Sequence, residues 1–100
     1  MTRTQQNEHN QQVLQAYSLF KERNEKIIRS YRLRTCSAIV YETDNYWILQ
    51  SYNTWIAIID RNDGTLYDWL RYVYGFTATS AQHIAKFAKD YNAGMIYTYR

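Results

Sequence analysis

The stretch that decides the fold is Thr54-Trp-Ile-Ala-Ile-Ile-Asp60-Arg-Asn-Asp-Gly64-Thr-Leu-Tyr-Asp-Trp-Leu70. Aromatic and β-branched residues dominate both of its ends, and such residues favour strands. The central Asp63-Gly64 is typical of a tight hairpin turn, because glycine supplies the positive φ that the turn requires. The sequence therefore predicts two antiparallel strands, over residues 54–60 and 65–70, joined by a turn over 61–64.

The residues before this hairpin predict further strands. Segments 36–41 and 46–52 are rich in aromatic and β-branched residues, and the polar segment 42–45 between them has the composition of a turn. Segments 46–52 and 54–60 form either two strands or one long strand that bends near residues 51–53.

A helix is predicted before the strands, over roughly residues 5–31, from apolar side chains that recur at the helical period. Asn24 interrupts this apolar stripe, so the helix either bends or ends early at that point. The side chains at the helical spacing are Val13, Tyr17, Phe20, Ile27 and Tyr31.

A second helix is predicted over about residues 80–91, after a loop over 72–77. Thr79 and Gln82 have the spacing of a capping box, and the helix stops at residues 92–94. The alternating tail over residues 95–99 adds a short strand. The apolar face of this helix should pack on the sheet, and the residues expected to meet there are Ile56, Ile58, Leu66, Ile84 and Phe87.

The fold class is therefore α+β: an N-terminal helix, an antiparallel sheet of three to four strands with a hairpin, a second helix packed on the sheet, and a short C-terminal strand. One hundred residues make a single domain, 1–100, and the polar start, residues 1–12, is the candidate for a mobile segment. The longest apolar stretch, 55–59, is too short to span a bilayer, and the polar start lacks the apolar run of a signal peptide. Cys36 is the one cysteine, and we interpret it as a small buried hydrophobe in a reducing, cytoplasmic compartment.

The sequence offers little catalytic or metal-binding chemistry. His83 has Phe87 four residues later instead of a second ligand, so we expect it to pack or hydrogen-bond locally, while His9 lies in the polar start. Residues 60–64 are similar to a calcium loop, but the glycine comes one place early and Arg71 stands where the bidentate Glu belongs. We therefore expect neither a metal, nor a cofactor, nor an enzyme.

The aromatic content of 17% exceeds what a core of this size needs. Trp47, Trp55, Phe20 and Phe87 are expected in the core, and the remainder should lie near the surface. Clustered Tyr and Trp side chains mark binding surfaces, since they bring a large contact area at a low entropy cost. The predicted partner-binding residues, near the end of the hairpin, are Tyr67, Trp69, Arg71, Tyr72 and Tyr74.

The positive charge is concentrated in residues 21–34, which hold six basic and two acidic side chains, a net charge of +4. This segment is either a solvated helix face or a stripe that contacts phosphates next to stacking aromatics. No helix-turn-helix, zinc-finger or RNP-type motif accompanies it. The candidate nucleic-acid-binding residues are Lys21, Arg23, Lys26, Arg29, Arg32 and Arg34.

Several motifs also carry a family resemblance. Ser51-Tyr-Asn-Thr54-Trp-Ile-Ala57, Gly64-Thr-Leu-Tyr67, the Thr/Ser-rich entry 77–80 and the helix with His83-Ile84 resemble a family of small uncharacterised bacteriophage and prophage domains. The resemblance covers roughly residues 46–91, and the run Trp-Leu-Arg-Tyr-Val-Tyr before the helix departs from the family pattern. It implies an origin in a phage or mobile element, and no catalytic residues to carry over.

Small phage proteins often act by covering a surface of a host machine, and inhibitors of CRISPR nucleases are one such class. By this analogy, the first hypothesis is a non-enzymatic protein that binds and inhibits a host defence component in the bacterial cytoplasm. The alternative is a nucleic-acid-binding accessory protein that uses the basic segment. Neither hypothesis involves a membrane.

Overall fold

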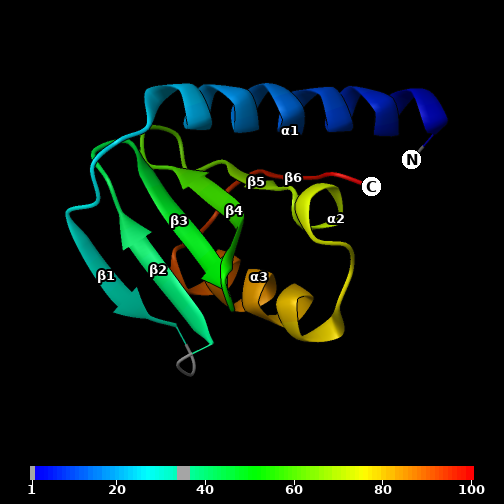
Figure 1. The fold of residues 1–100 in the computed structure, drawn as a ribbon. Helices are drawn as coiled ribbons and strands as arrows, with labels where there is room; N and C mark the ends of the chain where they lie inside the picture. The colour runs from blue at the N-terminus through cyan, green and yellow to red at the C-terminus, as the bar shows by residue number, and fades with distance from the viewer. Residues whose placement is uncertain (1, 34–36) are drawn as a thin grey trace.

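The computed structural model describes residues 2–33 and 37–100, in which helices lie against both faces of one six-stranded sheet (Figure 1). The strands follow one another in chain order across the sheet, all antiparallel except for the parallel pair β5–β6. The elements are α1 (Arg3–Arg23), β1 (Arg29–Arg32), β2 (Ala38–Glu42), β3 (Tyr46–Ser51), β4 (Thr54–Asp60), β5 (Leu66–Asp68), α2 (Leu70–Val73), α3 (Ala78–Asp90) and β6 (Ile96–Thr98).

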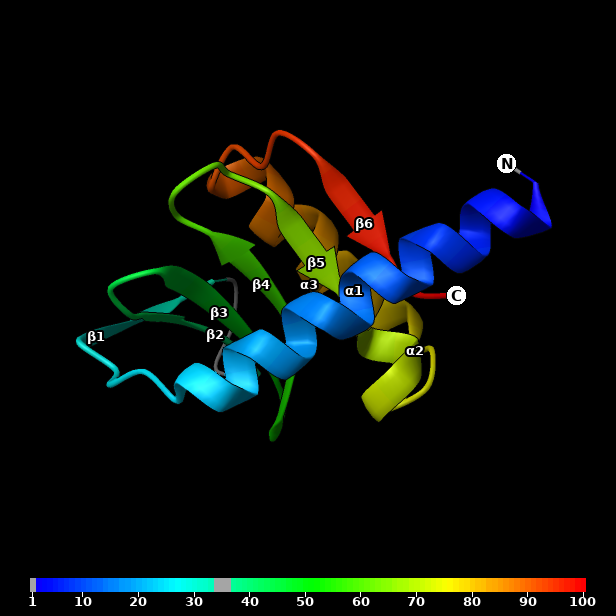
Figure 2. The same ribbon diagram turned by 90° about the horizontal axis from the view of Figure 1, so that it is seen from above.

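The predicted α+β class is confirmed, whereas the predicted sheet was too small and wrongly all antiparallel. Helix α1 crosses one face of the sheet and α3 packs against the other (Figures 1 and 2). Because α3 carries the chain back along the sheet, β6 enters beside β5 in the same direction. Leu66 pairs with Ile96 and Asp68 with Thr98 in this parallel ladder.

Helix α1 is shorter than the predicted 5–31, and it ends at Asn24 as the alternative allowed. Asn24 adopts a left-handed conformation with φ 44° and donates its N–H to Phe20 O, which is a common way for a helix to end. At the other end, Thr2 and Gln5 form a capping box. The described part of the polar start is therefore helical, and the Asn10 side chain bonds to the backbone of Arg100.

Strand β1 occupies residues that the sequence assigned to the first helix. It pairs with β2, with Arg29 opposite Glu42 and Arg32 opposite Ile39. The correction follows from tertiary pairing, which outweighs the weak helical preference of a segment that lies beyond the cap at Asn24. The apolar residues that follow the cap, Ile27 and Tyr31, accordingly leave the face shared by Val13 and Phe20.

The hairpin at Asp63-Gly64 is confirmed, and of the two alternatives for residues 46–60 the structure has two strands. Segments β3 and β4 are two separate strands, joined by a two-residue turn in which Tyr52 has φ 55°. Strands β4 and β5 are joined through Gly64, whose φ of 77° is the conformation that the Asp-Gly signal predicted.

The segment between the hairpin and α3 departs from the prediction in two details. The predicted loop over 72–77 begins inside the short helix α2. Helix α3 begins earlier than expected, because Thr77 is its N-cap and accepts a hydrogen bond from Ser80 N. Thr79 and Gln82 therefore lie inside the helix instead of capping it.

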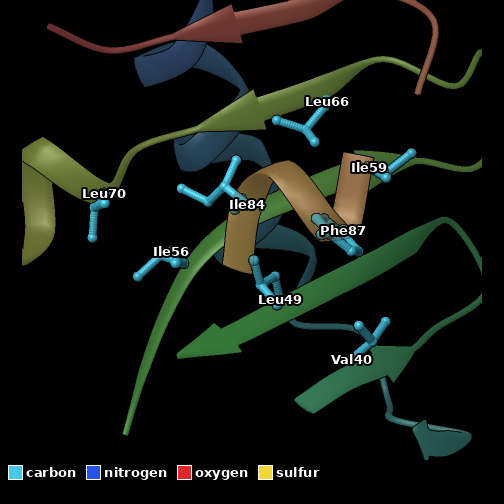
Figure 3. Packing of buried hydrophobic residues seen from close by; sticks show 9 residues of the cluster. Val40, Leu49, Ile56, Ile59, Leu66, Leu70, Ile84 and Phe87 are labelled. Atoms are coloured by element: carbon cyan, nitrogen blue, oxygen red, sulfur yellow. The ribbon is translucent and has the colours of Figure 1, made fainter. Parts of the chain in front are cut away.

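Two hydrophobic clusters hold the layers together, one on each face of the sheet. The cluster beneath α3 is largely aliphatic and contains Ile84 and Phe87, as predicted (Figure 3). Ile58 was expected there but points to the α1 side. The buried members of the α1-side cluster are Val13, Phe20, Tyr46, Ile48, Ile58 and Trp69.

Arg34 and Cys36 fall outside the described residues. Among the described residues, no helix has the length and apolar character needed to cross a bilayer.

Candidate partner-binding groove

The structure separates the five predicted partner-binding residues, and Trp69 does not lie at the surface. Its side chain is 0% exposed, with its ring 4.6 Å from that of Tyr17 and 5.6 Å from that of Phe20. Its indole Nε1 donates to Trp55 O at 2.9 Å. The expected exposure of Trp69 was wrong because α1 covers the face of the sheet to which β5 and Trp69 direct their aromatic side chains.

Tyr67 is also withdrawn from solvent. It is half-buried on the α1 side, with its ring stacked on Tyr97 of β6 at 5.6 Å between centroids and 10° between planes. Burial, followed by the nearby carboxylates of Asp63 and Asp60, raises the pKa of the Tyr67 hydroxyl above its usual value. Tyr67 therefore serves mainly to pack β5 against β6.

The other three predicted residues are exposed around α2. Arg71 places its guanidinium 4.5 Å from the centroid of the Phe76 ring, and Tyr74 follows the helix as its C-cap. Tyr72 is 50% exposed and contacts Tyr17 edge-on at 5.8 Å. Of the predicted set, Tyr72 thus lies beside a feature that the sequence did not reveal.

This feature is a groove of about 510 Å³ between the C-terminal half of α1 and the β3–β4 hairpin. Aromatic rings from α1 and β4 line it, together with polar side chains from both elements. The lining residues are Tyr17, Phe20, Lys21, Asn24, Glu25, Ile48, Gln50, Asn53, Thr54, Trp55 and Val73. Pockets of this size and mixed character are typical of binding sites.

A bulge in β4 directs Trp55 into this groove. The register between β3 and β4 shifts between Leu49 and Gln50, so that Leu49 pairs with Ala57 while Gln50 pairs with Trp55. Ile56, the residue left over, turns with Ala57 toward the α3 side. Bulges commonly re-aim a side chain in this way. Without the bulge, Trp55 would pair with Ser51 and face α3.

Trp55 is held firmly although it is 38% exposed, which corrects its predicted place in the core. Its Nε1 donates to Gln50 Oε1 at 3.1 Å, and its ring lies 5.6 Å from Phe20 and 6.2 Å from Tyr41. A large ring that is both exposed and already ordered loses little entropy when a partner covers it.

Charges of both signs stand at the rim of the groove. Lys21 Nζ lies 5.2 Å from the centroid of the Tyr17 ring. Glu25 accepts hydrogen bonds from Thr43 Oγ1 at 2.7 Å and from Asn45 Nδ2 at 2.6 Å, which tie the α1–β1 connection to the β2–β3 turn. Burial acts to raise the pKa of Glu25, but these hydrogen bonds and the nearby Arg23 outweigh it and hold that pKa below its usual value.

The basic segment does not form one helical stripe. Lys21 and Arg23 lie at the end of α1, Lys26 lies in the following connection, and Arg29 and Arg32 lie on β1. Arg23 is 3.9 Å from Glu25, and Arg29 Nε is 3.3 Å from Glu42 Oε1. The segment is therefore not one face of a helix, because α1 ends at Arg23, and two of its charges face carboxylates of the same chain.

One histidine–serine cluster occurs on the α3 side. His83 Nδ1 lies 2.8 Å from Ser51 Oγ, which is also 2.9 Å from Ser80 Oγ. All three residues are buried, so a substrate has no access to Ser51 Oγ, and the cluster joins α3 to β3. His83 packs and hydrogen-bonds as predicted, although its partner is distant in sequence. Among the described residues, no group of three or more His, Cys, Asp or Glu side chains is placed to hold a metal ion.

The chain was compared with protein families, with curated proteins and with solved structures. No protein-family model matches the chain, and searches of the curated proteins and of the solved structures found no match. The resemblance to phage domains therefore remains a prediction from residues 46–91.

Proposed function

We propose that this chain is a non-enzymatic binding protein, and that the groove holds an apolar side chain of a protein partner. The observation that carries the proposal is Trp55, which is exposed, ordered and directed by a bulge into a hollow lined by other aromatic rings. Buried aromatic anchors in pockets supply most of the affinity in many protein interfaces.

The surroundings of the groove favour a protein partner over a nucleic acid. Among the described residues, Lys21 is the one lysine or arginine that lines it, and the Glu25 carboxylate lines it too. A nucleic acid would meet that carboxylate with its phosphates, whereas a protein surface matches charges of both signs. Tyr72 extends the aromatic surface beyond the groove, as the centre of an interface usually requires.

Capture from a bacterial lysate tests this proposal, if the immobilised wild-type protein is compared with three variants. Trp55→Ala and Lys21→Glu alter the groove, whereas Met95→Ala alters an exposed apolar side chain that does not line it. We expect the groove variants to lose a protein that the wild type and Met95→Ala both retain, with or without nuclease. Equal capture by all four proteins would contradict the proposal.

The finer proposal is that the partner is a host defence component, such as a CRISPR nuclease, and that binding inhibits it. It is supported by the resemblance to phage domains and by the analogy with small phage inhibitors, and it places the protein in the host bacterial cytoplasm. Protection of a DNA target in a nuclease cleavage assay tests it. Wild-type protein should protect the target and Trp55→Ala should not.

Nucleic-acid binding remains a second candidate because Lys21, Lys26 and Arg32 form no ion pair within the described residues. Phosphate contacts release counterions, so binding should weaken steeply as salt rises. Replacing Lys26, Arg29 and Arg32 with Gln should then weaken binding evenly across sequences and flatten the salt dependence. Equal affinity of the wild type and this variant for single-stranded DNA would remove this candidate.

A further inference from the structure

Strand β1 is an edge strand, and within the part of the chain that the structure describes no strand pairs with its outer side. It pairs with β2 on one side and ends the sheet on the other, as Figure 1 shows. All four of its residues, Arg29–Arg32, are exposed. An open edge presents unpaired backbone groups that bind another extended chain.

The register identifies the backbone groups that face outward. Leu33 N donates to Ala38 O at 2.9 Å, directly after the pair Arg32–Ile39. Hydrogen-bonded pairs alternate along an antiparallel ladder, so the pair Tyr31–Val40 also bonds to β2, and at the end of the ladder Ile28 N donates to Glu42 O at 2.8 Å. The N–H and C=O groups of Ser30 and Arg32 therefore point away from the sheet.

The side chains of β1 place positive charge on both faces of this edge. Arg29 and Tyr31 reach Glu42 on the α3 side, where the Tyr31 hydroxyl donates to Glu42 Oε1 at 3.0 Å. Arg32, an odd number of residues from both, points to the α1 side. A guest strand would thus meet Arg32, which forms no ion pair within the described residues, on one face, and on the other face Arg29, which Glu42 holds in place at 3.3 Å.

We propose that the outer edge of β1 binds an extended, acidic peptide segment of a protein partner. Two acidic residues three positions apart in the guest would lie opposite Arg29 and Arg32, because an odd spacing puts them on opposite faces. Opposite charges that face each other across strands stabilise the pairing. This mode of binding, in which a peptide adds a strand to a sheet, combines main-chain affinity with side-chain specificity.

Charge argues against a second copy of this chain as the occupant. Pairing of two β1 strands would bring four guanidinium groups to one short ladder. Each copy would contribute those of Arg29 and Arg32. Like charges at this range destabilise a sheet. An acidic guest would instead place opposite charges beside the same two arginines.

The test uses three labelled hexapeptides and the intact protein. Val-Glu-Val-Thr-Glu-Val has the expected spacing, Val-Glu-Val-Glu-Thr-Val has the same composition with both acids on one face, and Val-Lys-Val-Thr-Lys-Val has the opposite charge. Fluorescence anisotropy measures their affinities. We expect the first to bind on the order of tenfold more tightly than the lysine peptide, and severalfold more tightly than the peptide with altered spacing. Equal affinities of all three, or no binding of the first at millimolar concentration, would overturn the proposal.

A backbone variant tests the mode of binding. Ser30→Pro removes an outward N–H that β2 does not use, and Ser30→Ala is the matched control that keeps it. We expect Ser30→Pro to weaken the acidic peptide at least about fivefold and Ser30→Ala to leave it unchanged. Amide exchange of Leu33, whose N–H bonds to Ala38 O, reports whether β1 stays in place. In the wild type, the peptide should slow exchange at Ser30 and Arg32, and unchanged exchange there would contradict strand addition even if the variant unfolds.

Other occupants give distinct results. Slow exchange at Ser30 and Arg32 that appears on raising protein concentration without peptide would assign the edge to a second copy. Tighter binding of single-stranded DNA than of the acidic peptide, unaffected by Ser30→Pro, would assign it to nucleic acid. Trp55→Ala should leave peptide binding unchanged, so failure of the edge and failure of the groove can be distinguished.

Discussion

The two faces of the sheet are built from different side chains and are closed to different extents. Under α3, the buried residues are mainly aliphatic and surround Phe87, and the hollow lined by Leu70 and Ile84 is the smaller one, about 220 Å³. Under α1, aromatic rings predominate and leave a groove of about 510 Å³ beside a half-exposed Trp55. The comparison suggests a division of roles, in which the α3 face supplies stability and the α1 face supplies a binding surface.

The largest effect is expected from removing a buried ring on the α3 face. Phe87→Ala should lower the free energy of unfolding by about 3–5 kcal/mol, the usual range for removing a fully buried aromatic ring. Urea denaturation measures this loss. Trp55→Ala is the matched variant on the α1 face, and it should cost clearly less. A loss below about 1 kcal/mol for Phe87→Ala would contradict the proposed division of roles.

In partner binding, we expect the change on the α1 face to have the larger effect. Trp55→Ala should cost at least about 2 kcal/mol in the binding of a captured partner, the threshold for an interface hot spot. Tyr74→Ala, an exposed ring that does not line the groove, is the control and should change the affinity little. Titration calorimetry measures both, and equal losses for the two variants would remove the special role of Trp55.

The sequence predicted the α3 face better than the α1 face. The Asp63-Gly64 turn and the apolar residues Ile84 and Phe87 are local signals, and each was confirmed. The strand at 29–32 could not be predicted because its formation depends on pairing with β2.

The groove could not be predicted from the sequence for a related reason. A one-residue bulge at Ile56 decides which face Trp55 occupies, and no turn or glycine marks that bulge in the sequence. The sequence pattern also led to the wrong prediction that Trp69 is exposed. The burial of Trp69 depends on the reach of α1 over β5 and β6, and this reach is set by contacts between distant parts of the chain. Among these contacts is the hydrogen bond from Gln6 Nε2 to Thr98 O.

Glu25 should make the stability of the fold depend on pH in the acidic range. Its folded pKa lies below the usual 4.5, so the ionised form stabilises the fold above that value. The stabilisation should disappear as the pH falls through the lowered folded pKa. Glu25→Gln should therefore lower stability by about 1 kcal/mol at pH 7, and the difference from wild type should shrink in acid. A difference that stays constant with pH would contradict this assignment.

Asp68 should show the opposite sign and the smallest effect. Burial raises its pKa, although the hydrogen bond from Leu70 N and the charges of Arg71 and Arg100 act to lower it. A raised folded pKa adds stability at low pH, and this stability is lost as the pH rises through that pKa. Asp68→Asn keeps an acceptor for Leu70 N without the charge, and should raise the melting temperature slightly at pH 7. A clear decrease would show that the ionised carboxylate stabilises the fold.

The central claim is that Trp55 is an exposed, ordered anchor while Trp69 is part of the core. The most direct measurement is the paramagnetic relaxation of the two indole rings by a soluble nitroxide, recorded by NMR with and without the captured partner. We expect strong relaxation of Trp55 in the free protein that is lost in the complex, and weak relaxation of Trp69 in both states. Equal relaxation of the two rings in the free protein, or no protection of Trp55 by the partner, would contradict the claim.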